Sequence, residues 1–386
     1  MNIGIVTLYD NMNIGAALQA YALSQIIREM GHQCTDIRYV RVSNGMRDSA
    51  VNRKKRIKML SKKNGWKTIV MKAAGRVLLF PQMRIRRERH AAFIRERIQL
   101  TEQRYVGLEQ IKDTVGKFDC FICGSDNIWN RLRSDPTFFL SFVPDDVRKF
   151  SYAAGMSATS LTEEEQKWMI PLIERLDEIS VRDSVGRELL SGLTKRVIRE
   201  DLDPTMLYAG EEWRRLARRA EGIPDRFIFC YLLGDNVLAR DAARAAVMKY
   251  RLPIVTLPHA NAIHSSDFGF GDRRLYNVGP YEFLDLMDRA EYVITDSFHG
   301  MVFALLFHKQ FVVFRRFLEG DARELNLRLD CLLKKCGIDN RIAEGVEKAL
   351  DILEAPVEYD AVEQRLDKCR NDSLQYLRRM TSGTME

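Results

Sequence analysis

The sequence lacks the features that would place it in a membrane or in a disulfide-rich secreted class. No apolar run approaches the ~20 residues that a membrane-spanning helix needs, and no signal-peptide pattern opens the chain. The seven cysteines are odd in number and scattered without the spacing of a disulfide framework. We therefore expect a protein of the reducing cytoplasm.

Clusters with the spacing of a metal site are also missing from the sequence. The nearest pattern is Cys120-x-x-Cys123, but both residues lie in the apolar run 118–123, where strand alternation puts them on opposite faces. His259 and His264 share a loop and are candidates to line a cleft. The sequence predicts no metal requirement and no resident cofactor.

Positive charge is abundant, but it is concentrated in one segment. Residues 41–104 hold 19 Lys and Arg against 4 acidic residues, whereas the whole chain carries a net charge of only +7. Apolar residues in this insert fit amphipathic helices. Two interpretations stay open: peripheral contact with anionic lipid at the inner face of the membrane or with an anionic glycan carrier, or a solvated helical hairpin. Because no nucleic-acid-binding motif or stacking platform accompanies the charge, we expect no nucleic-acid partner.

Strand-like and helix-like segments alternate in two series along the 386 residues. Predicted strands of the first series lie at 2–8, 34–40, 118–123, 149–154, 179–182 and 196–201, and those of the second at 226–233, 253–257, 291–295 and 310–314. Asp203-Pro204 breaks the chain between the two series. The pattern predicts an α/β protein with two tandem Rossmann-like, doubly wound domains that face a cleft. We expect domains at 1–203, with the basic insert 41–104, and at 204–340, followed by a helical tail, 341–386, that packs back on the body.

Polar turns follow several of these strands, and 296–300, Asp-Ser-Phe-His-Gly, is the most informative. A strand-to-helix turn lies at the carboxyl edge of a sheet, where free N–H groups and the helix dipole favour anions. A histidine there can exchange a proton near neutral pH. The structural alternative is that Ser297 only caps the helix and His299 is a packed core residue. Similar turns occur at 10–15, 124–130 and 182–183.

Taken together and in order, these turns resemble the polysaccharide pyruvyl transferase family. The resemblance covers most of the chain and is strongest in one block, Val293 to Gly300. Supporting matches are Asn13-Ile14-Gly15, the run 121–130, Ser180 to Asp183, Asp203-Pro204-Thr205 and Arg328. The chain departs from the family at Asn127, where Gln is more usual, at Asp183, where Glu is more usual, and at 155–157, where Gly-Met-Ser replaces Ser-Phe-Gly. These departures leave the acceptor open.

The resemblance implies a fold of the two-domain glycosyltransferase type, GT-B. It also implies phosphoenolpyruvate as donor and, as acceptor, a sugar of a cell-envelope polysaccharide or of its lipid-linked precursor. The acceptor is expected on the N-terminal side and the donor on the C-terminal side. The product is a pyruvate ketal, released together with phosphate.

The chemistry assigns hypothetical roles to the residues of these turns. His299 is the candidate proton donor or phosphate ligand, Arg182 the phosphate ligand, and Asp126 a base or hydroxyl ligand, with a turn-forming role as its alternative. The predicted substrate-binding residues are Asn13, Gly15, Ser125, Asp296, Ser297, Gly300 and Arg328. Two other functions remain open: a sugar-nucleotide-dependent glycosyltransferase on the same fold, and a non-catalytic adaptor that binds membranes or glycans through the insert.

Overall fold

A computed structural model describes residues 1–10, 12–42, 66–130, 135–259, 264–316 and 326–382, with the backbone alone for 66–78. Its N-terminal sheet is parallel, in the order β2-β1-β5-β6. The strands are β1 (Asn2–Val6), β2 (Gln33–Asp36), β5 (Cys120–Cys123) and β6 (Arg148–Ser151). Two short parallel pairs complete this half of the molecule: β3 (Tyr39–Val40) with β4 (Tyr105–Val106), and β7 (Ile179–Val181) with β8 (Ile198–Glu200).

The second sheet is also parallel, in the order β11-β10-β9-β12-β13-β14. Its strands are β9 (Ile228–Tyr231), β10 (Ile254–Thr256), β11 (Arg273–Arg274), β12 (Tyr292–Thr295), β13 (Gln310–Phe314) and β14 (Ile342–Ala343). The two edge strands are only two residues long, which is why their periodicity is invisible in the sequence. Predicted strand 34–40 is wrong in its second half, because the chain leaves the sheet after Asp36 and Tyr39–Val40 pairs with β4 instead.

Helices cover both faces of each sheet. Those before residue 220 are α1 (Ile14–Glu29), α3 (Trp66–Arg97), α4 (Gly107–Ile111), α5 (Glu163–Glu174), α6 (Ser184–Ser191) and α7 (Gly210–Leu216). The later ones are α8 (Val237–Tyr250), α9 (Pro280–Arg289), α10 (Phe298–Leu306), α11 (Leu327–Cys336), α12 (Val346–Glu354) and α13 (Tyr359–Thr381). Successive side chains of β9 point to opposite faces of the sheet. Ile228 packs with α8 and α12 on one face, and Phe229 packs with α9 and α10 on the other.

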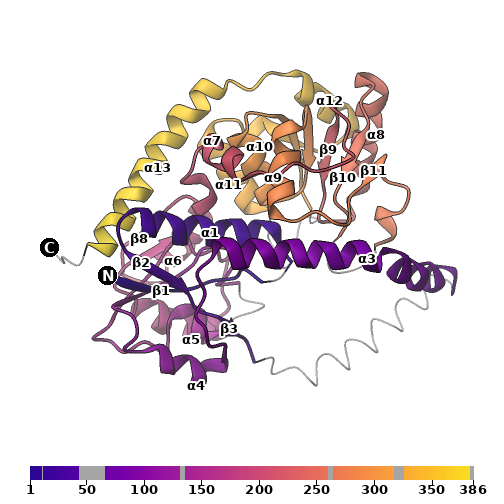
Figure 1. Cartoon of the computed structure of the whole chain (residues 1–386). Coiled ribbons are helices and arrows are strands. Elements are labelled where there is room, and N and C mark those ends of the chain that lie inside the picture. The colour runs from indigo at the N-terminus through magenta and orange to yellow at the C-terminus, as the bar shows by residue number, and fades with distance from the viewer. Residues whose placement is uncertain (11, 43–65, 131–134, 260–263, 317–325, 383–386) are drawn as a thin grey trace.

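Helix α1 lies between the two halves of the molecule (Figure 1), which explains why its sequence is apolar nearly all round. One side packs on the N-terminal sheet, and the other meets α3, α7 and α9. Tyr21 is an example: its ring makes edge-to-face contacts with Phe93 of α3 and Trp213 of α7. A single hydrophobic cluster therefore includes residues of both sheets, so the two halves are packed together through α1.

The described part of the basic insert is helical, as predicted, but its second half is packed into the core rather than solvated. Residues 66–97 form one long helix, α3, which Figure 1 shows running alongside α1, while 43–65 lie outside the described residues. Phe93 is fully buried, and buried Arg86 donates to the carbonyl of Pro258 at 2.8 Å. Arg97 donates to the Tyr281 hydroxyl at 2.8 Å. The second half of α3 is thus part of the core between the two halves, and several of its charges make structural contacts.

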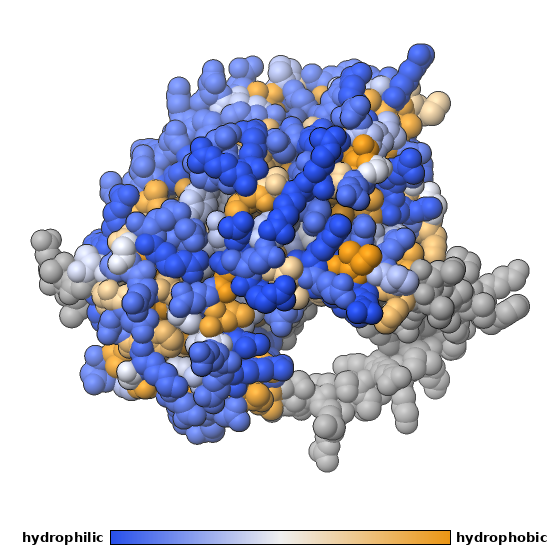
Figure 2. All heavy atoms as spheres, in the orientation of Figure 1, coloured by the Kyte–Doolittle hydropathy of each residue, from blue (hydrophilic) through white to orange (hydrophobic). Residues whose placement is uncertain are grey.

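Helix α13 bridges the two halves along one side of the molecule (Figure 1). Tyr376 donates to the carbonyl of Ser151 on β6, and Ser373 accepts from the backbone N–H of Leu202. At its other end, His308 of the C-terminal half contacts Glu363 at 3.0 Å. No helix in the described ranges has an apolar stretch long enough to cross a membrane. The face drawn in Figure 2 is mostly hydrophilic, with hydrophobic residues scattered over it.

Candidate functional site

His299 lies in the first turn of α10, directly after β12, as the sequence predicts for this turn. Ser297 is the N-cap residue of α10, and its hydroxyl accepts a hydrogen bond from the N–H of Gly300 at 3.3 Å. A side chain at Gly300 would collide with the Thr295 hydroxyl, at 2.3 Å from the added carbon. The capping role considered for Ser297 is therefore present, and His299 is 94% buried beside the cap.

The start of helix α1 faces the same histidine from the other half of the molecule. A carbon atom added at Gly15 would lie 2.1 Å from Nδ1 of His299, so any side chain at this position would displace the imidazole. Asn13 caps α1 by accepting from the N–H groups of Gly15, at 3.1 Å, and Ala16, at 3.4 Å. Two helix N-termini, one from each half, therefore direct positive dipole ends toward His299.

Arg182 and His299 meet on one carboxylate, that of Asp203. Arg182 Nη1 donates to Asp203 Oδ2 at 2.9 Å, and His299 Nε2 lies 3.6 Å from the same oxygen. Burial by itself would raise the pKa of Asp203, but His299, Arg182 and the Thr205 hydroxyl hold that pKa well below its usual range. Asp203 is therefore ionised at neutral pH and orders both side chains.

A second arginine, Arg328 on α11, joins this cluster. Its guanidinium carbon lies 5.3 Å from the centre of the Phe298 ring, and that of Arg182 lies 4.7 Å from the same ring. Burial, together with the positive charges of Arg182 and Arg316, lowers the pKa of Arg328 to about 9. The neighbouring arginines thus make the charged form of Arg328 less favourable. An anion bound among them would offset this repulsion.

The cluster also holds hydrogen-bond donors that the protein leaves unused. Within the described part of the chain, Arg182 Nε and Nη2 and Arg328 Nε are buried atoms without a hydrogen-bond partner, and His299 Nε2 has only the Asp203 oxygen at 3.6 Å. An unsatisfied buried polar atom is costly and in native proteins is usually met by a ligand or water. A carbon added at Gly155 would lie 2.8 Å from Arg182 Nη2, so the glycine allows the guanidinium its position. We call Arg182, Asp203, His299 and Arg328 the anion centre.

Asp126 and Asp296 are placed differently with respect to the anion centre. Asp126 Oδ1 lies 3.8 Å from Arg182 Nη1, and its backbone is left-handed, with φ of 57°. Asp296 accepts hydrogen bonds from the N–H groups of Leu233 and Gly234 at 2.7 and 2.8 Å and pairs with Arg316 at 3.5 Å. The carboxylate of Asp296 is thus engaged in fixing the turn before α10 to neighbouring loops.

Ser125, a predicted substrate-binding residue, is fully buried. Its hydroxyl donates to the carbonyl of Ala153 at 2.7 Å, and its N–H donates to Gln19 of α1 at 3.2 Å. These bonds tie the loop after β5 to both β6 and α1. The structure therefore brings Arg182, His299, Arg328 and Asp126 together, with Gly15 against the imidazole, while Ser125 supports the loop that carries Asp126.

His259 and His264 lie at the carboxyl end of β10 and form a separate group with Asp235. Their rings stack at 3.8 Å between centroids, His259 Nδ1 contacts Asp267 at 2.9 Å, and His264 Nδ1 contacts Asp235 at 3.3 Å. One potential ligand atom from each of Asp235, His259 and His264 lies within 4.8 Å of the others, so these residues are the candidates to hold a divalent cation. Because the two rings are nearly parallel, at 17°, their lone pairs do not converge without rearrangement. The expected absence of a metal requirement stays a prediction.

Sequence reasoning missed two residues that shape the anion centre. The sequence identifies Asp203 as a chain break before Pro204 and as part of a family match but assigns it no role in the site, although its carboxylate joins Arg182 and His299. Arg316 follows β13, and its guanidinium donates to the backbone carbonyl of Asp296 at 2.9 Å. The strand-end rule applied to 310–314 would have drawn attention to Arg316, whereas nothing local to the sequence pairs Asp203 with His299.

Comparisons with known proteins identify the family and the fold. A family model described as polysaccharide pyruvyl transferase matches residues 13–316. The chain belongs to this family. The matched range contains Gly15, Asp126, Arg182 and His299 but ends before Arg328. No curated protein matches the sequence.

Solved structures with a similar course of the chain confirm the predicted fold class. A putative UDP-N-acetylglucosamine 2-epimerase from Listeria monocytogenes has a TM-score of 0.56 at 11% identity, covering 100% of this chain and 98% of its own. The UDP-GlcNAc 2-epimerase of Methanocaldococcus jannaschii, in complex with UDP-GlcNAc and UDP, has a TM-score of 0.51 at 14% identity, covering 99% and 100%. At these identities the likeness concerns the fold, which is α/β with two Rossmann-like, doubly wound halves of the GT-B type.

Proposed function

We propose that this family member transfers the pyruvyl group of phosphoenolpyruvate to two hydroxyls of a sugar, forming a ketal. The donor methylene gains a proton and becomes a methyl group, and C2 forms bonds to two sugar oxygens. The bond from C2 to the phosphate oxygen breaks, and inorganic phosphate leaves. Two hydroxyl protons are released, one replacing the proton given to the methylene and one leaving with phosphate, so the reaction needs no oxidant and no net proton.

The anion centre supports the choice of donor. Phosphoenolpyruvate carries close to three negative charges at neutral pH, in a phosphate and a carboxylate that each accept bidentate hydrogen bonds. Arg182 and Arg328 offer planar guanidiniums with unused buried donors, and the N-termini of α1 and α10 add backbone dipoles. Donors held in place before the reaction stabilise the charge that grows on the leaving phosphate.

His299 is the proposed acid. Its Nε2 lies 3.6 Å from the ionised carboxylate of Asp203, which holds the ring in place. In the proposed cycle, imidazolium gives its proton to the methylene carbon, and an attacking sugar hydroxyl returns one to the ring. A positioned acid or base of this kind contributes about 10²- to 10⁴-fold to the rate. Asp126, 6% exposed and 3.8 Å from Arg182, is the proposed ligand or base for an acceptor hydroxyl.

The observation that carries the proposal is the meeting of Arg182 and His299 on Asp203. The test is incubation with phosphoenolpyruvate and a panel of bacterial cell-envelope glycans, free and lipid-linked. We expect phosphate release that depends on one glycan, together with a mass increase on that glycan equal to one pyruvate ketal. Phosphate release without a ketal, or no reaction with any glycan while phosphoenolpyruvate fails to bind, would refute the proposal.

The fold also supports a second candidate, a sugar-nucleotide-dependent transferase, because a solved neighbour of the same fold is in complex with UDP-GlcNAc and UDP. Thermal-shift titrations separate the two. We expect phosphoenolpyruvate to raise the melting temperature and UDP or UDP-GlcNAc to leave it unchanged at the same concentration. The opposite order would favour the second candidate.

The adaptor alternative needs a different test from deletion of residues 41–104. Because Phe93 and Arg86 of α3 are buried in the core, deleting the insert would unfold the protein whatever its function. Charge reversal at exposed positions of α3, such as Arg87 and Arg95, keeps the core intact. An enzyme should keep its turnover on a soluble glycan after this change, and an adaptor should lose binding.

A further inference from the structure

A cavity of about 600 Å³ opens at the carboxyl ends of the N-terminal strands. Its walls come from the segment after β1, from β3 and its neighbours, and from the loop after β5; they include Leu8, Asp10, Arg38, Tyr39, Arg41, Arg104, Asn127 and Phe138. The volume lies within the range of small-molecule sites, which are roughly 300–1,000 Å³. We call it the arginine pocket.

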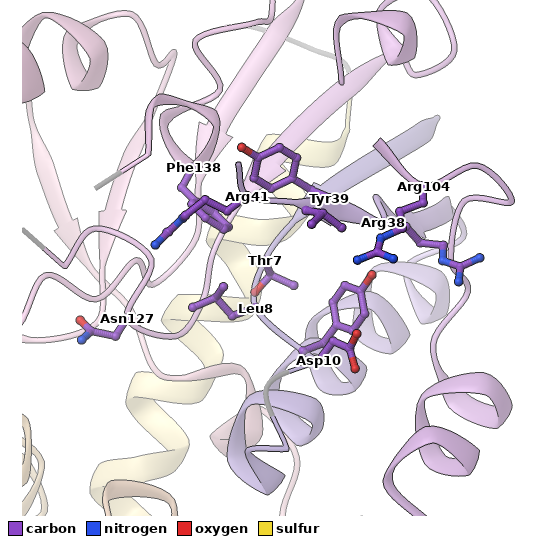
Figure 3. Close-up of a pocket in the computed structure, with 11 residues that line it drawn as sticks. Thr7, Leu8, Asp10, Arg38, Tyr39, Arg41, Arg104, Asn127 and Phe138 are labelled. Carbon is purple, nitrogen blue, oxygen red and sulfur yellow. The ribbon is translucent and has the colours of Figure 1, made fainter. Parts of the chain in front are cut away.

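Three arginines give the pocket its charge. Arg41 is partly neutralised, since its Nε lies 3.3 Å from Asp135, and its guanidinium lies over the Phe138 ring at 5.4 Å. Neither Arg38 nor Arg104 lies within ion-pair distance of an acidic side chain in the described ranges. Figure 3 shows these two arginines at the end of the pocket near Asp10, and Arg41 alongside Phe138 at another wall. The lining therefore carries a net positive charge. Arg38 Nη1 donates to the carbonyl of Glu102 at 3.2 Å, which leaves the other donors of Arg38 and the Arg104 guanidinium for an anion.

The pocket adjoins the anion centre through one short loop. Asn127 lines the pocket, and its neighbour Asp126 lies 3.8 Å from Arg182. Asn127 Oδ1 is buried and accepts no hydrogen bond from the described residues. Leu8 and Thr7, which also line the pocket, are bonded through Gln19 to α1, the helix whose start faces His299. A ligand in the pocket thus has one end near the place where the pyruvyl group is transferred.

Aromatic side chains complete the walls. Tyr39 and Phe138 meet edge to face at 5.8 Å between centroids, and the Tyr39 hydroxyl donates to Asp135 at 2.7 Å. Apolar ring faces pack against the C–H faces of sugar rings, whereas Asp10 and Asn127 offer acceptors to hydroxyls. Guanidinium groups in addition select a carboxylate or phosphate, because their fork matches those groups bidentately.

We infer that the arginine pocket binds an anionic saccharide, and that the acceptor therefore carries a negative group near the reacting sugar. This inference rests on the proposed function in that it assigns the pocket to the acceptor. Two sources share the chemistry: a uronate carboxylate within the glycan, or the diphosphate that links a glycan to its carrier lipid. Arg38 and Arg104 bind the anion, and the partly exposed Tyr39 packs on the sugar, with the buried Phe138 ring supporting Tyr39 and Arg41 from behind.

The test uses a glycan array that carries neutral, uronate-containing and diphosphate-linked bacterial glycans. Wild-type protein should bind anionic glycans in preference to neutral ones with the same backbone. The double variant Arg38→Gln/Arg104→Gln should bind them roughly 10- to 100-fold more weakly, as expected for lost hydrogen bonds to charged groups. Binding confined to the uronate arm or to the diphosphate arm identifies the source of the charge.

A matched control is Arg87→Gln/Arg95→Gln, which removes the same charge from exposed positions on α3 outside the pocket. It should bind glycans like wild type, and all three proteins should share one melting temperature and one affinity for phosphoenolpyruvate. Equal binding of neutral and anionic glycans, equal loss in both double variants, or no glycan binding would overturn the inference. Anionic-glycan binding that depends on Arg38 and Arg104, without phosphate release from phosphoenolpyruvate, would keep the pocket and refute the proposed function.

Discussion

The molecule holds two groups of arginines, and they are built in opposite ways. In the anion centre, Arg182 has 1% of its side chain exposed and Arg328 has its pKa lowered to about 9 by burial and neighbouring cations. In the arginine pocket, the guanidiniums line an open cavity of about 600 Å³. The cavity beside Arg182, Asp203 and Arg328 is only about 10 Å³, so a ligand of the anion centre must be small and must displace side chains to enter. The open pocket keeps its charges solvated and accommodates a larger ligand. The comparison matches a small donor and a bulky acceptor.

The largest effect is expected from removing the proposed acid of the anion centre. His299→Ala should lower kcat by about 10²- to 10⁴-fold, because proton transfer to the methylene loses its positioned donor. The measurement is glycan-dependent phosphate release, with circular dichroism to show that the fold is kept. His308→Ala, at the other end of the same helix and half-exposed against Glu363, is the control and should retain wild-type turnover. Full activity in His299→Ala would remove this residue from the mechanism.

An Arg-to-Lys substitution keeps the charge but removes the planar guanidinium. It should raise the KM for phosphoenolpyruvate in the buried anion centre and leave it unchanged at an exposed position. Arg182→Lys keeps a positive charge beside Asp203, but a lysine cannot hydrogen-bond phosphoenolpyruvate and the Asp203 carboxylate at the same time, as the planar guanidinium can. We expect the KM for phosphoenolpyruvate to rise roughly 10- to 100-fold, a loss of one or two charged hydrogen bonds. Arg187→Lys, at a half-exposed position of α6, should leave the KM unchanged. Equal values for the two variants would show that Arg182 does not bind the donor.

The pH dependence of donor binding should expose the lowered pKa of Arg328. A guanidinium with a pKa of about 9 is charged below that pH and neutral above it, while the donor phosphate is fully ionised well before. The dissociation constant for phosphoenolpyruvate, measured by calorimetry, should therefore rise between pH 8 and pH 10. Arg328→Gln should bind more weakly at pH 8 and lose most of this rise. A flat profile for wild type would contradict the account of a crowded, buried cluster.

A smaller effect is expected from replacing the buried Asp36, and it concerns only the stability of the fold. Burial raises the pKa of Asp36 to about 8 from 3.8, with Arg28 opposing the rise. Since the folded state binds the proton more tightly, the stability contributed by this group falls as pH rises through that window. Asp36→Asn should therefore gain stability relative to wild type, by an amount that grows by about 2 kcal/mol between pH 6 and pH 8. Urea denaturation measures it, and a gain independent of pH would refute the assignment.

The smallest effect is expected from metal removal, because guanidinium groups supply the positive charge in both regions. EDTA should change the initial rate of phosphate release less than about twofold. Loss of activity in EDTA, with recovery on adding a divalent cation, would contradict this expectation. The variant His264→Ala would then show whether Asp235, His259 and His264 hold the ion.

Local pattern was enough to predict much of the fold and part of the site. The strand predicted at 310–314 has its predicted bounds, and the turn after β12 carries His299 where the sequence placed it. These features depend on periodicity and on the rule that parallel strand ends share one edge. The family resemblance found the same turns, and the family match confirms it.

The remaining features depend on contacts between distant parts of the chain. The charge of 41–104 left a solvated helical hairpin open, yet Phe93 of α3 packs against Tyr281, nearly 190 residues away, at 4.9 Å between ring centroids. Contact of this insert with anionic lipid stays a prediction. Asp203 meets His299 only because the two halves fold against α1. The arginine pocket likewise combines Arg38, Arg104 and Asn127 from three separate segments, so no short sequence motif could have predicted it.

The most direct test of the account is a crystal structure with phosphoenolpyruvate bound. We expect the donor phosphate within hydrogen-bond distance of the Arg182 guanidinium and of His299 Nε2, the two groups that now share Asp203. Phosphoenolpyruvate bound elsewhere, with the Arg182 and His299 nitrogens free of it, would contradict the proposed transfer reaction.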